Sequence, residues 1–62
     1  MKWFKDKTLV KVGCDYLIYT KDHQYLAGKI VRIENKEELF FKSSDGQWHI
    51  GLHWIEKFVE IE

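Results

Sequence analysis

Residues 39–52 read LFFKSSDGQWHIGL, and this stretch decides the fold because it can turn back on itself at Asp45-Gly46. Asp-Gly pairs supply the positive φ angles of a type I′ turn, so we predict a two-residue β-hairpin turn with Ser44 paired to Gln47. A slip of one residue would exchange the two faces of the hairpin, so turn chemistry and hydrophobic pattern support the same register. The predicted pairs are Ser43–Trp48, Phe41–Ile50 and Leu39–Leu52 on an apolar face, and Lys42–His49, Phe40–Gly51 and Glu38–His53 on a mixed face.

The composition indicates one small domain over residues 1–62, in which residues 1–7 could form an N-terminal extension. A chain of this size hides only about 60% of its unfolded surface, and its three Trp, three Tyr and four Phe residues supply the large side chains that such a core needs. Cys14 is the single cysteine, which excludes an intramolecular disulfide scaffold and favours a reducing cytoplasm. We expect neither a signal peptide nor a membrane span.

The other elements follow from shorter patterns. A β-branched run predicts a first strand over residues 8–12, whereas residues 14–24 are ambiguous and fit a long, partly paired loop. Residues 25–34 predict a long strand, in which Gly28 marks a bulge or a close approach of another backbone. An odd-length turn around residues 35–37 would pair Ile33 with Leu39 and Val31 with Phe41, and would set Arg32 beside Phe40.

The doublets Trp54-Ile55 and Phe58-Val59 cannot both be buried on one side of a straight strand, so a helical turn over residues 53–57 and a short last strand are expected. Five short strands that leave no open edge predict an all-β barrel. The predicted core comprises Val10, Val12, Val31, Ile33, Leu39, Phe41, Trp48, Ile50, Leu52, Val59 and Ile61.

This order of elements resembles the SH3-like barrels, and residues 26–33 followed by residues 39–46 look like the centre of a Tudor-like member. Residues 53–59 also resemble the family's helical turn and closing strand, so the resemblance covers roughly residues 8 to 62. Tudor-like domains that bind methylated side chains use an aromatic cage, for which Tyr16, Tyr19 and Trp48 lie near matching places. Compact barrels of this kind also resemble small phage or prophage proteins that act on host machinery.

The residues carry no recognisable catalytic constellation, and we expect neither an enzyme nor a cofactor. His49 and His53 share one face of the hairpin, but a zinc site would need further ligands such as Cys14 and His23 from the long loop. We therefore expect no metal. Cys14 lacks a neighbouring base or cation that would activate it, so we interpret it as a small hydrophobic residue.

A surface patch is the remaining candidate site. Phe40 points away from the predicted core beside Arg32, and Arg-aromatic patches are enriched in binding hot spots. We predict a small adaptor, regulator or inhibitor that binds another protein through Trp3, Arg32, Phe40, Lys42, His49 and His53. The alternative is a nucleic-acid-binding barrel, for which a net charge of zero offers no general support. The sequence leaves the oligomeric state open.

Overall fold

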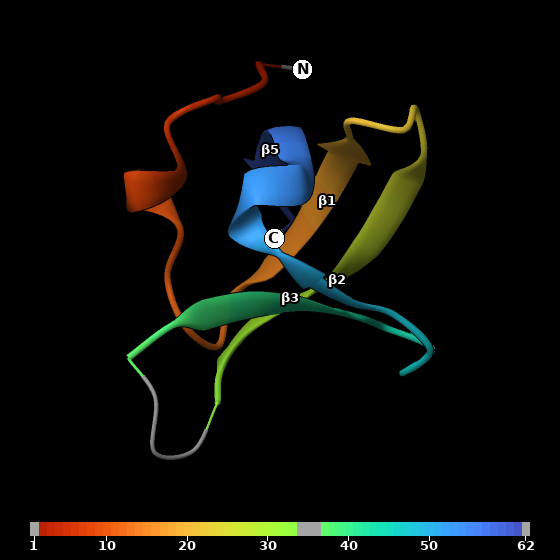
Figure 1. The fold of residues 1–62 in the computed structure, drawn as a ribbon. Helices are drawn as coiled ribbons and strands as arrows, with labels where there is room; N and C mark the ends of the chain where they lie inside the picture. Colours follow the sequence, from red (N-terminus) through yellow and green to blue (C-terminus); the bar gives the residue numbers. More distant parts are fainter. Residues whose placement is uncertain (1, 34–36, 62) are drawn as a thin grey trace.

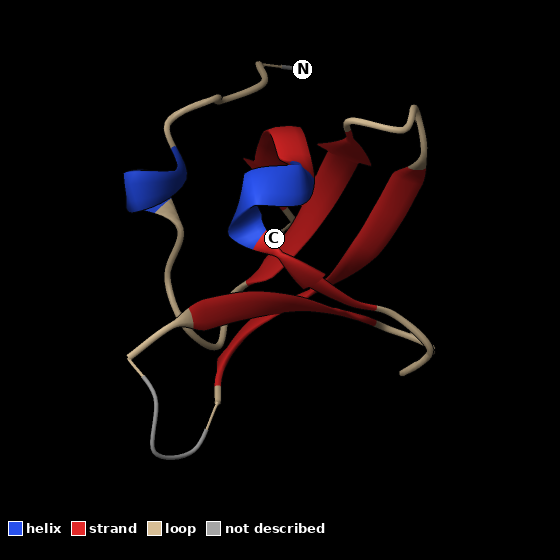
Figure 2. Ribbon diagram, in the orientation of Figure 1, coloured by secondary structure: helices blue, strands red, loops and turns tan. Residues whose placement is uncertain are grey.

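A computed structural model describes residues 2–33 and 37–61 and shows one antiparallel sheet of five strands with two short 3-10 turns (Figures 1 and 2). The sheet is strongly twisted, so that β3 runs across the direction of β1 in Figure 1. The spatial order of the strands is β4-β3-β2-β1-β5. The all-β, five-stranded prediction is therefore confirmed. The elements are η1 (Lys7–Leu9), β1 (Asp15–Thr20), β2 (Tyr25–Arg32), β3 (Leu39–Ser43), β4 (His49–Gly51), η2 (Leu52–Trp54) and β5 (Ile55–Glu60).

The predicted first strand over residues 8–12 is wrong, and the segment instead contains η1. Asp6 begins this turn, because its carboxylate accepts hydrogen bonds from the backbone N–H of Thr8 (3.0 Å) and from the Thr8 hydroxyl (2.6 Å). Val10 is buried, but Val12 is exposed. The strand β1 lies where a loop was expected, and it buries alternate residues, including Tyr16 and Ile18, against the core.

The hairpin register is confirmed at Phe40–Gly51, Phe41–Ile50 and Lys42–His49, but the turn type is wrong. Gly46 has φ 77° and Asp45 does not have a positive φ, so the type I′ conformation is absent from this turn. The turn is instead closed by the Gly46 N–H, which donates to the Ser43 carbonyl oxygen (2.9 Å). The Asp45 carboxylate reinforces it by accepting from the Ser43 hydroxyl (2.5 Å) and the Gln47 N–H (3.0 Å).

The predicted pairing between β2 and β3 is wrong by one residue. Ile30, not Val31, faces Phe41, and Arg32 pairs with Leu39. Ile30 and Val31 are both apolar and β-branched, so the pattern alone does not decide which of them is buried. Residues 35 and 36 of the predicted turn and residue 34 of the predicted strand lie outside the described residues.

The core differs from the prediction accordingly. Its buried apolar members are Val10, Tyr16, Ile18, Ile30, Phe41, Ile55 and Phe58. Only Val10 and Phe41 were predicted correctly as buried. The other predicted core residues are not buried. Five of them are half-buried, namely Val31, Leu39, Ile50, Leu52 and Val59, and four are exposed, namely Val12, Ile33, Trp48 and Ile61.

Gly28 allows β2 and β3 to approach closely, which confirms the second of the two roles expected for it. A Cβ atom at this position would lie 2.2 Å from the Lys42 carbonyl oxygen and 2.8 Å from the Ser43 Cα. Both neighbours are backbone atoms, which cannot move aside without shifting the strand. Only glycine therefore fits this position in the observed ladder.

The helical turn is confirmed but is shorter and begins earlier than predicted, and β5 is longer than the predicted last strand. A register shift between Tyr19 and Thr20, in the pairing of β1 with β5, accommodates the doublets. It lets both Ile55 and Phe58 reach the core, although they are three residues apart. Trp54 consequently remains outside, with half of its surface exposed.

The two edge strands, β4 and β5, differ in what covers them. Phe4 forms a bridge to Phe58, with two backbone hydrogen bonds of 2.8 Å, and so covers part of the outer edge of β5. Within residues 2–33 and 37–61, no strand ladder joins β4 to β5. The pairing thus establishes a five-stranded sheet, and its closure into a barrel stays a prediction. No helix within these residues has the length and hydrophobicity needed to cross a membrane.

Candidate functional site

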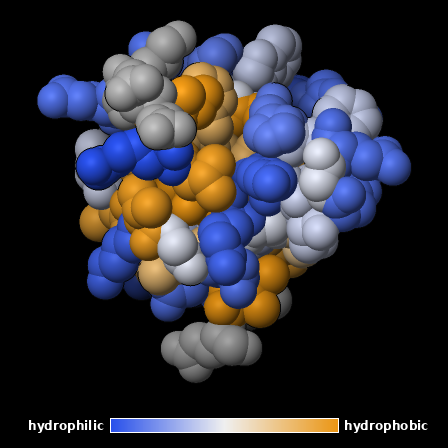
Figure 3. Space-filling model, turned by 90° about the horizontal axis from the view of Figure 1, so that it is seen from below, coloured by the Kyte–Doolittle hydropathy of each residue, from blue (hydrophilic) through white to orange (hydrophobic). Residues whose placement is uncertain are grey.

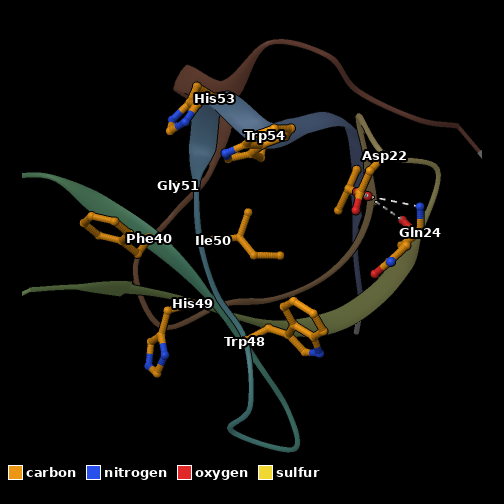
Figure 4. Close-up of a pocket in the computed structure, with 10 residues that line it drawn as sticks. Asp22, Gln24, Phe40, Trp48, His49, Ile50, Gly51, His53 and Trp54 are labelled. Carbon is orange, nitrogen blue, oxygen red and sulfur yellow. Dashed lines mark hydrogen bonds between the residues drawn. The ribbon is translucent and has the colours of Figure 1, made fainter.

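A groove of about 340 Å³ opens between β4 and the turn that joins β1 to β2 (Figure 4). Trp48 and Trp54 lie on opposite sides of it, and the Ile50 side chain lies between them. Each tryptophan residue is about half exposed, at 47% for Trp48 and 50% for Trp54. Large exposed aromatic side chains around an apolar floor are typical of binding surfaces.

The local folding of each segment explains why the two tryptophans are exposed. Trp48 directly precedes β4, where its N–H donates to the Ser43 hydroxyl (3.0 Å) and its carbonyl accepts from the Ser43 N–H (3.0 Å). Trp54 ends η2, and its neighbour Ile55 takes the buried place at the start of β5. The backbone of Trp54 is also held, because its carbonyl accepts from the Lys21 N–H (2.9 Å). Both indoles are thus attached to ordered backbone.

The wall of the groove that faces β4 is polar and is formed by the turn between β1 and β2. Buried Thr20 organises this turn, because its hydroxyl donates to the Asp22 carboxylate and accepts from the Gln24 N–H (3.0 Å). His23 adopts the left-handed conformation (φ 68°), and its Nδ1 lies 2.7 Å from the Tyr19 hydroxyl. The turn thereby presents the exposed Asp22 and Gln24 to the groove, as Figure 4 shows.

The outer side of β4 completes the lining with Phe40, His49, Gly51 and His53. The His53 ring covers Gly51, since a Cβ atom on Gly51 would lie 2.7 Å from its Cε1. Phe40 is the cross-strand partner of Gly51, as predicted, but the nearest atoms above Gly51 belong to His53.

The structure therefore brings together only part of the predicted patch. Phe40, His49 and His53 line the groove, and Lys42 lies beside them as the cross-strand partner of His49. Arg32 pairs with Leu39, which places it on the face of the sheet opposite to that of Phe40. The predicted juxtaposition of Arg32 and Phe40 is wrong, because it depended on the incorrect pairing of β2 with β3.

Trp3 belongs to a different group of side chains, the N-terminal cluster, which comprises Trp3, Tyr19, Tyr25 and Lys57. Its ring lies 6.1 Å from that of Tyr25, and the Tyr25 ring lies 4.7 Å from that of Tyr19. The Lys57 ammonium lies over Trp3 (5.0 Å) and over Tyr19 (5.2 Å). These cation–π contacts fasten the N-terminal segment to β1 and β5.

The three residues considered for an aromatic cage do not converge. Tyr16 is buried against Phe58, and its hydroxyl accepts from the Lys11 N–H (2.9 Å). Tyr19 and Trp48 belong to the two separate clusters described above, and only Trp48 lines the groove. The structure thus places the three candidates in the core, in the N-terminal cluster and in the groove respectively.

Several polar groups stabilise the fold and lie outside the groove. Hydrogen bonds from Ser43 and Gln47 hold the pKa of Asp45 below its usual value, and hydrogen bonds from Thr8 do the same for Asp6. Burial raises the pKa of the Tyr16 phenol. Half-buried Cys14 precedes β1, whereas His23 lies in the turn that follows β1. Among the described residues, no group of three or more His, Cys, Asp or Glu side chains could hold a metal ion.

Sequence reasoning missed four members of the groove that lie outside the hairpin, namely Thr20, Asp22, Gln24 and Trp54. Asp22 lies in the segment for which the sequence predicts a loop, and Trp54 lies in the predicted helical turn. The doublet Trp54-Ile55 carried a usable signal, because only one residue of the pair can enter the core. No protein-family model, curated protein or solved structure matches this chain.

Proposed function

We propose that the chain is a non-catalytic binding module that holds a segment of another protein in the groove between Trp48 and Trp54. The observation that carries this proposal is the pair of half-exposed indoles on either side of Ile50. Tryptophan is among the residues most enriched at energetic hot spots of protein interfaces. Its burial by a partner would remove a large apolar area from water, which is the main favourable contribution to association.

The wider surface supports a binding role as well. Apolar side chains gather in a patch on the face seen in Figure 3, and hydrophilic side chains surround them. The strand order β4-β3-β2-β1-β5 is compatible with the SH3-like, Tudor-like barrel suggested by the sequence resemblance. We propose that fold for the chain, and a cytoplasmic adaptor, regulator or inhibitor as its role. The single free cysteine supports a reducing compartment.

Affinity capture tests the proposal. The tagged protein would be incubated with nuclease-treated lysate of its source organism, in parallel with Trp48→Ala and Trp54→Ala. We expect to capture a stoichiometric protein partner. Each substitution should weaken its binding by at least about 2 kcal/mol, as for a hot-spot residue. Tyr25→Ala is the matched control, since Tyr25 is also an exposed aromatic residue (61%) but does not line the groove. Equal capture by all four proteins would refute the proposal.

Nucleic-acid binding is the rival function, and its salt dependence separates it from ours. A duplex-binding protein loses about 0.9 log unit of affinity per log unit of salt for each phosphate it neutralises. We expect no such slope for the unmodified protein, because its net charge is zero and Arg32 does not lie beside Phe40. Tight, salt-sensitive oligonucleotide binding would reverse the ranking of the two functions. The cationic candidates for such an interface are Lys2, Lys5, Lys7, Lys11, Lys29, Arg32 and Lys42.

A further inference from the structure

The two edges of the sheet are unequal, and the uncovered part of β4 adjoins the groove. At the other edge of the sheet, Phe4 pairs with Phe58 and covers that part of β5. Among the described residues, neither His49 nor Gly51 makes a backbone hydrogen bond other than those of the regular strand and helix pattern. An edge with unpaired N–H and C=O groups is a template on which another strand can add.

The ladder geometry identifies which groups of β4 are directed outward. The Ser43 N–H donates to the Trp48 carbonyl, so the alternation of an antiparallel ladder makes Phe41 and Ile50 the next hydrogen-bonded pair. The N–H groups of His49 and Gly51 and the carbonyl of His49 therefore point away from β3. The carbonyl of Gly51 is not free for a partner strand. Gly51 is the N-cap of η2, and an N-cap carbonyl accepts the first helical hydrogen bond. Three backbone groups remain for a partner strand.

The same geometry determines which residue of an added strand would enter the groove. Residues directly opposite each other in a ladder point to the same face. A partner residue opposite Ile50 would thus project with Ile50 into the space between Trp48 and Trp54. Its neighbour opposite His49 would exchange two backbone hydrogen bonds with His49, and its neighbour opposite Gly51 would accept one from the Gly51 N–H.

The chemistry of the groove selects the side chain for that position. Its sides are indoles and its floor is apolar, whereas the far wall carries the Asp22 carboxylate. Within residues 2–33 and 37–61, the observed salt bridge joins Lys29 to Asp15, and Asp22 takes part in none. A lysine or arginine side chain complements this arrangement, because its aliphatic stem can lie between the indoles while its charged end reaches the carboxylate.

We propose that a partner protein adds an extended, antiparallel segment beside β4, with a lysine or arginine opposite Ile50 that reaches Asp22. This inference rests on the proposed function and specifies its ligand as a basic β-strand. Recognition by strand addition draws affinity from backbone hydrogen bonds and specificity from alternate side chains. The basic residue therefore supplies specificity, and its flanking residues supply the main-chain contacts.

The test uses a displayed library of random twelve-residue peptides, selected on the full chain and counter-selected on Trp48→Ala. The peptide recovered most often is synthesised and titrated by calorimetry. We expect a lysine or arginine at one constant position, whose replacement by norleucine weakens binding about tenfold. Asp22→Asn keeps an oxygen that accepts from the Thr20 hydroxyl. It should weaken binding of the parent peptide as much as the norleucine replacement does, and it should hardly change binding of the norleucine peptide. Asp15→Asn is the control, because Asp15 pairs with Lys29 outside the groove.

N-methylated peptides test the strand itself. Methylation of the residue after the basic one removes the donor to the His49 carbonyl and should weaken binding about tenfold. Methylation of the basic residue should have little effect, because its N–H points away from β4. Trp48-dependent peptides that lack a basic residue, or that tolerate both methylations, would overturn the strand model and leave the binding function intact. Failure to recover any Trp48-dependent peptide would overturn both proposals. Self-association of the free protein that Trp48→Ala abolishes would assign the edge to a second copy instead and overturn the basic-peptide proposal.

Discussion

Gly28→Ala should destabilise the protein strongly, although alanine is normally the better residue in a strand. Replacing a strand glycine by alanine reduces the entropy lost on folding and ordinarily favours the folded state by about 0.5–1 kcal/mol. At Gly28 the new Cβ would lie 2.2 Å from the Lys42 carbonyl oxygen, 2.7 Å from Phe41 Cζ and 2.8 Å from Ser43 Cα. Restoring ordinary contact requires β2 and β3 to separate by roughly 1 Å, which strains their hydrogen bonds.

Overpacking of about 1–3 kcal/mol and the weakening of one or two ladder hydrogen bonds of about 1 kcal/mol each add to about 2–5 kcal/mol. The entropic gain of alanine lowers the expected net cost to about 1–4 kcal/mol. A domain of this size has a total stability of about 3–9 kcal/mol. Urea denaturation followed by tryptophan fluorescence measures the change. If Gly28→Ala were as stable as the parent protein, the close approach of β2 and β3 would be refuted.

Gly51→Ala is the matched control for this prediction. Its Cβ atom would also meet neighbours at short distance, the nearest being His53 Cε1 at 2.7 Å. That neighbour is the end of an exposed side chain, which can rotate away. We therefore expect a change within about 1 kcal/mol. A loss equal to that of Gly28→Ala would show that contact distance alone, and not the rigidity of the backbone, sets the cost.

Two further predictions concern the core and the hairpin turn. Phe41→Ala should lower the free energy of unfolding, measured by urea denaturation, by about 3–5 kcal/mol because Phe41 is fully buried. Val12→Ala should change it by no more than about 0.5 kcal/mol because Val12 is exposed. Similar losses of stability in the two variants would contradict the observed core. The pKa of Asp45 is lowered in the folded state by hydrogen bonds from Ser43 and Gln47, so its carboxylate stabilises the fold above the unfolded pKa of about 4 and loses this effect as the pH falls through the lower folded pKa. Asp45→Asn should therefore reduce the fall in urea midpoint at acid pH, and an unchanged acid profile would argue against the turn hydrogen bonds.

The sequence by itself determined the pairing of β3 with β4. The polar segment between residues 43 and 48 has one plausible place to turn, and alternation on both sides of it agrees with only one register. This local consistency was sufficient for Phe40–Gly51, Phe41–Ile50 and Lys42–His49. It was not sufficient for the turn type, because an Asp-Gly pair suits several turns and the side-chain hydrogen bonds of Asp45 favour another one.

Tertiary structure decided the pairing of β2 with β3. Ile30 and Val31 are equally suited to burial, so the periodicity of the strand could not select a face. The approach of Gly28 to the backbone of Lys42 and Ser43 is compatible with only one arrangement. A glycine in the sequence indicates that a close contact is allowed, but only the neighbouring strand shows where that contact occurs.

The groove depended even more strongly on tertiary structure. The sequence identified Phe40, His49 and His53 because they share one face of a local hairpin, whose geometry follows from a few neighbouring residues. Asp22 is distant from that hairpin in sequence, and it meets Trp54 at the groove because β5 pairs with β1. Local patterns determine which side chains share a strand face, whereas the meeting of separate segments depends on long-range pairing that no short pattern encodes.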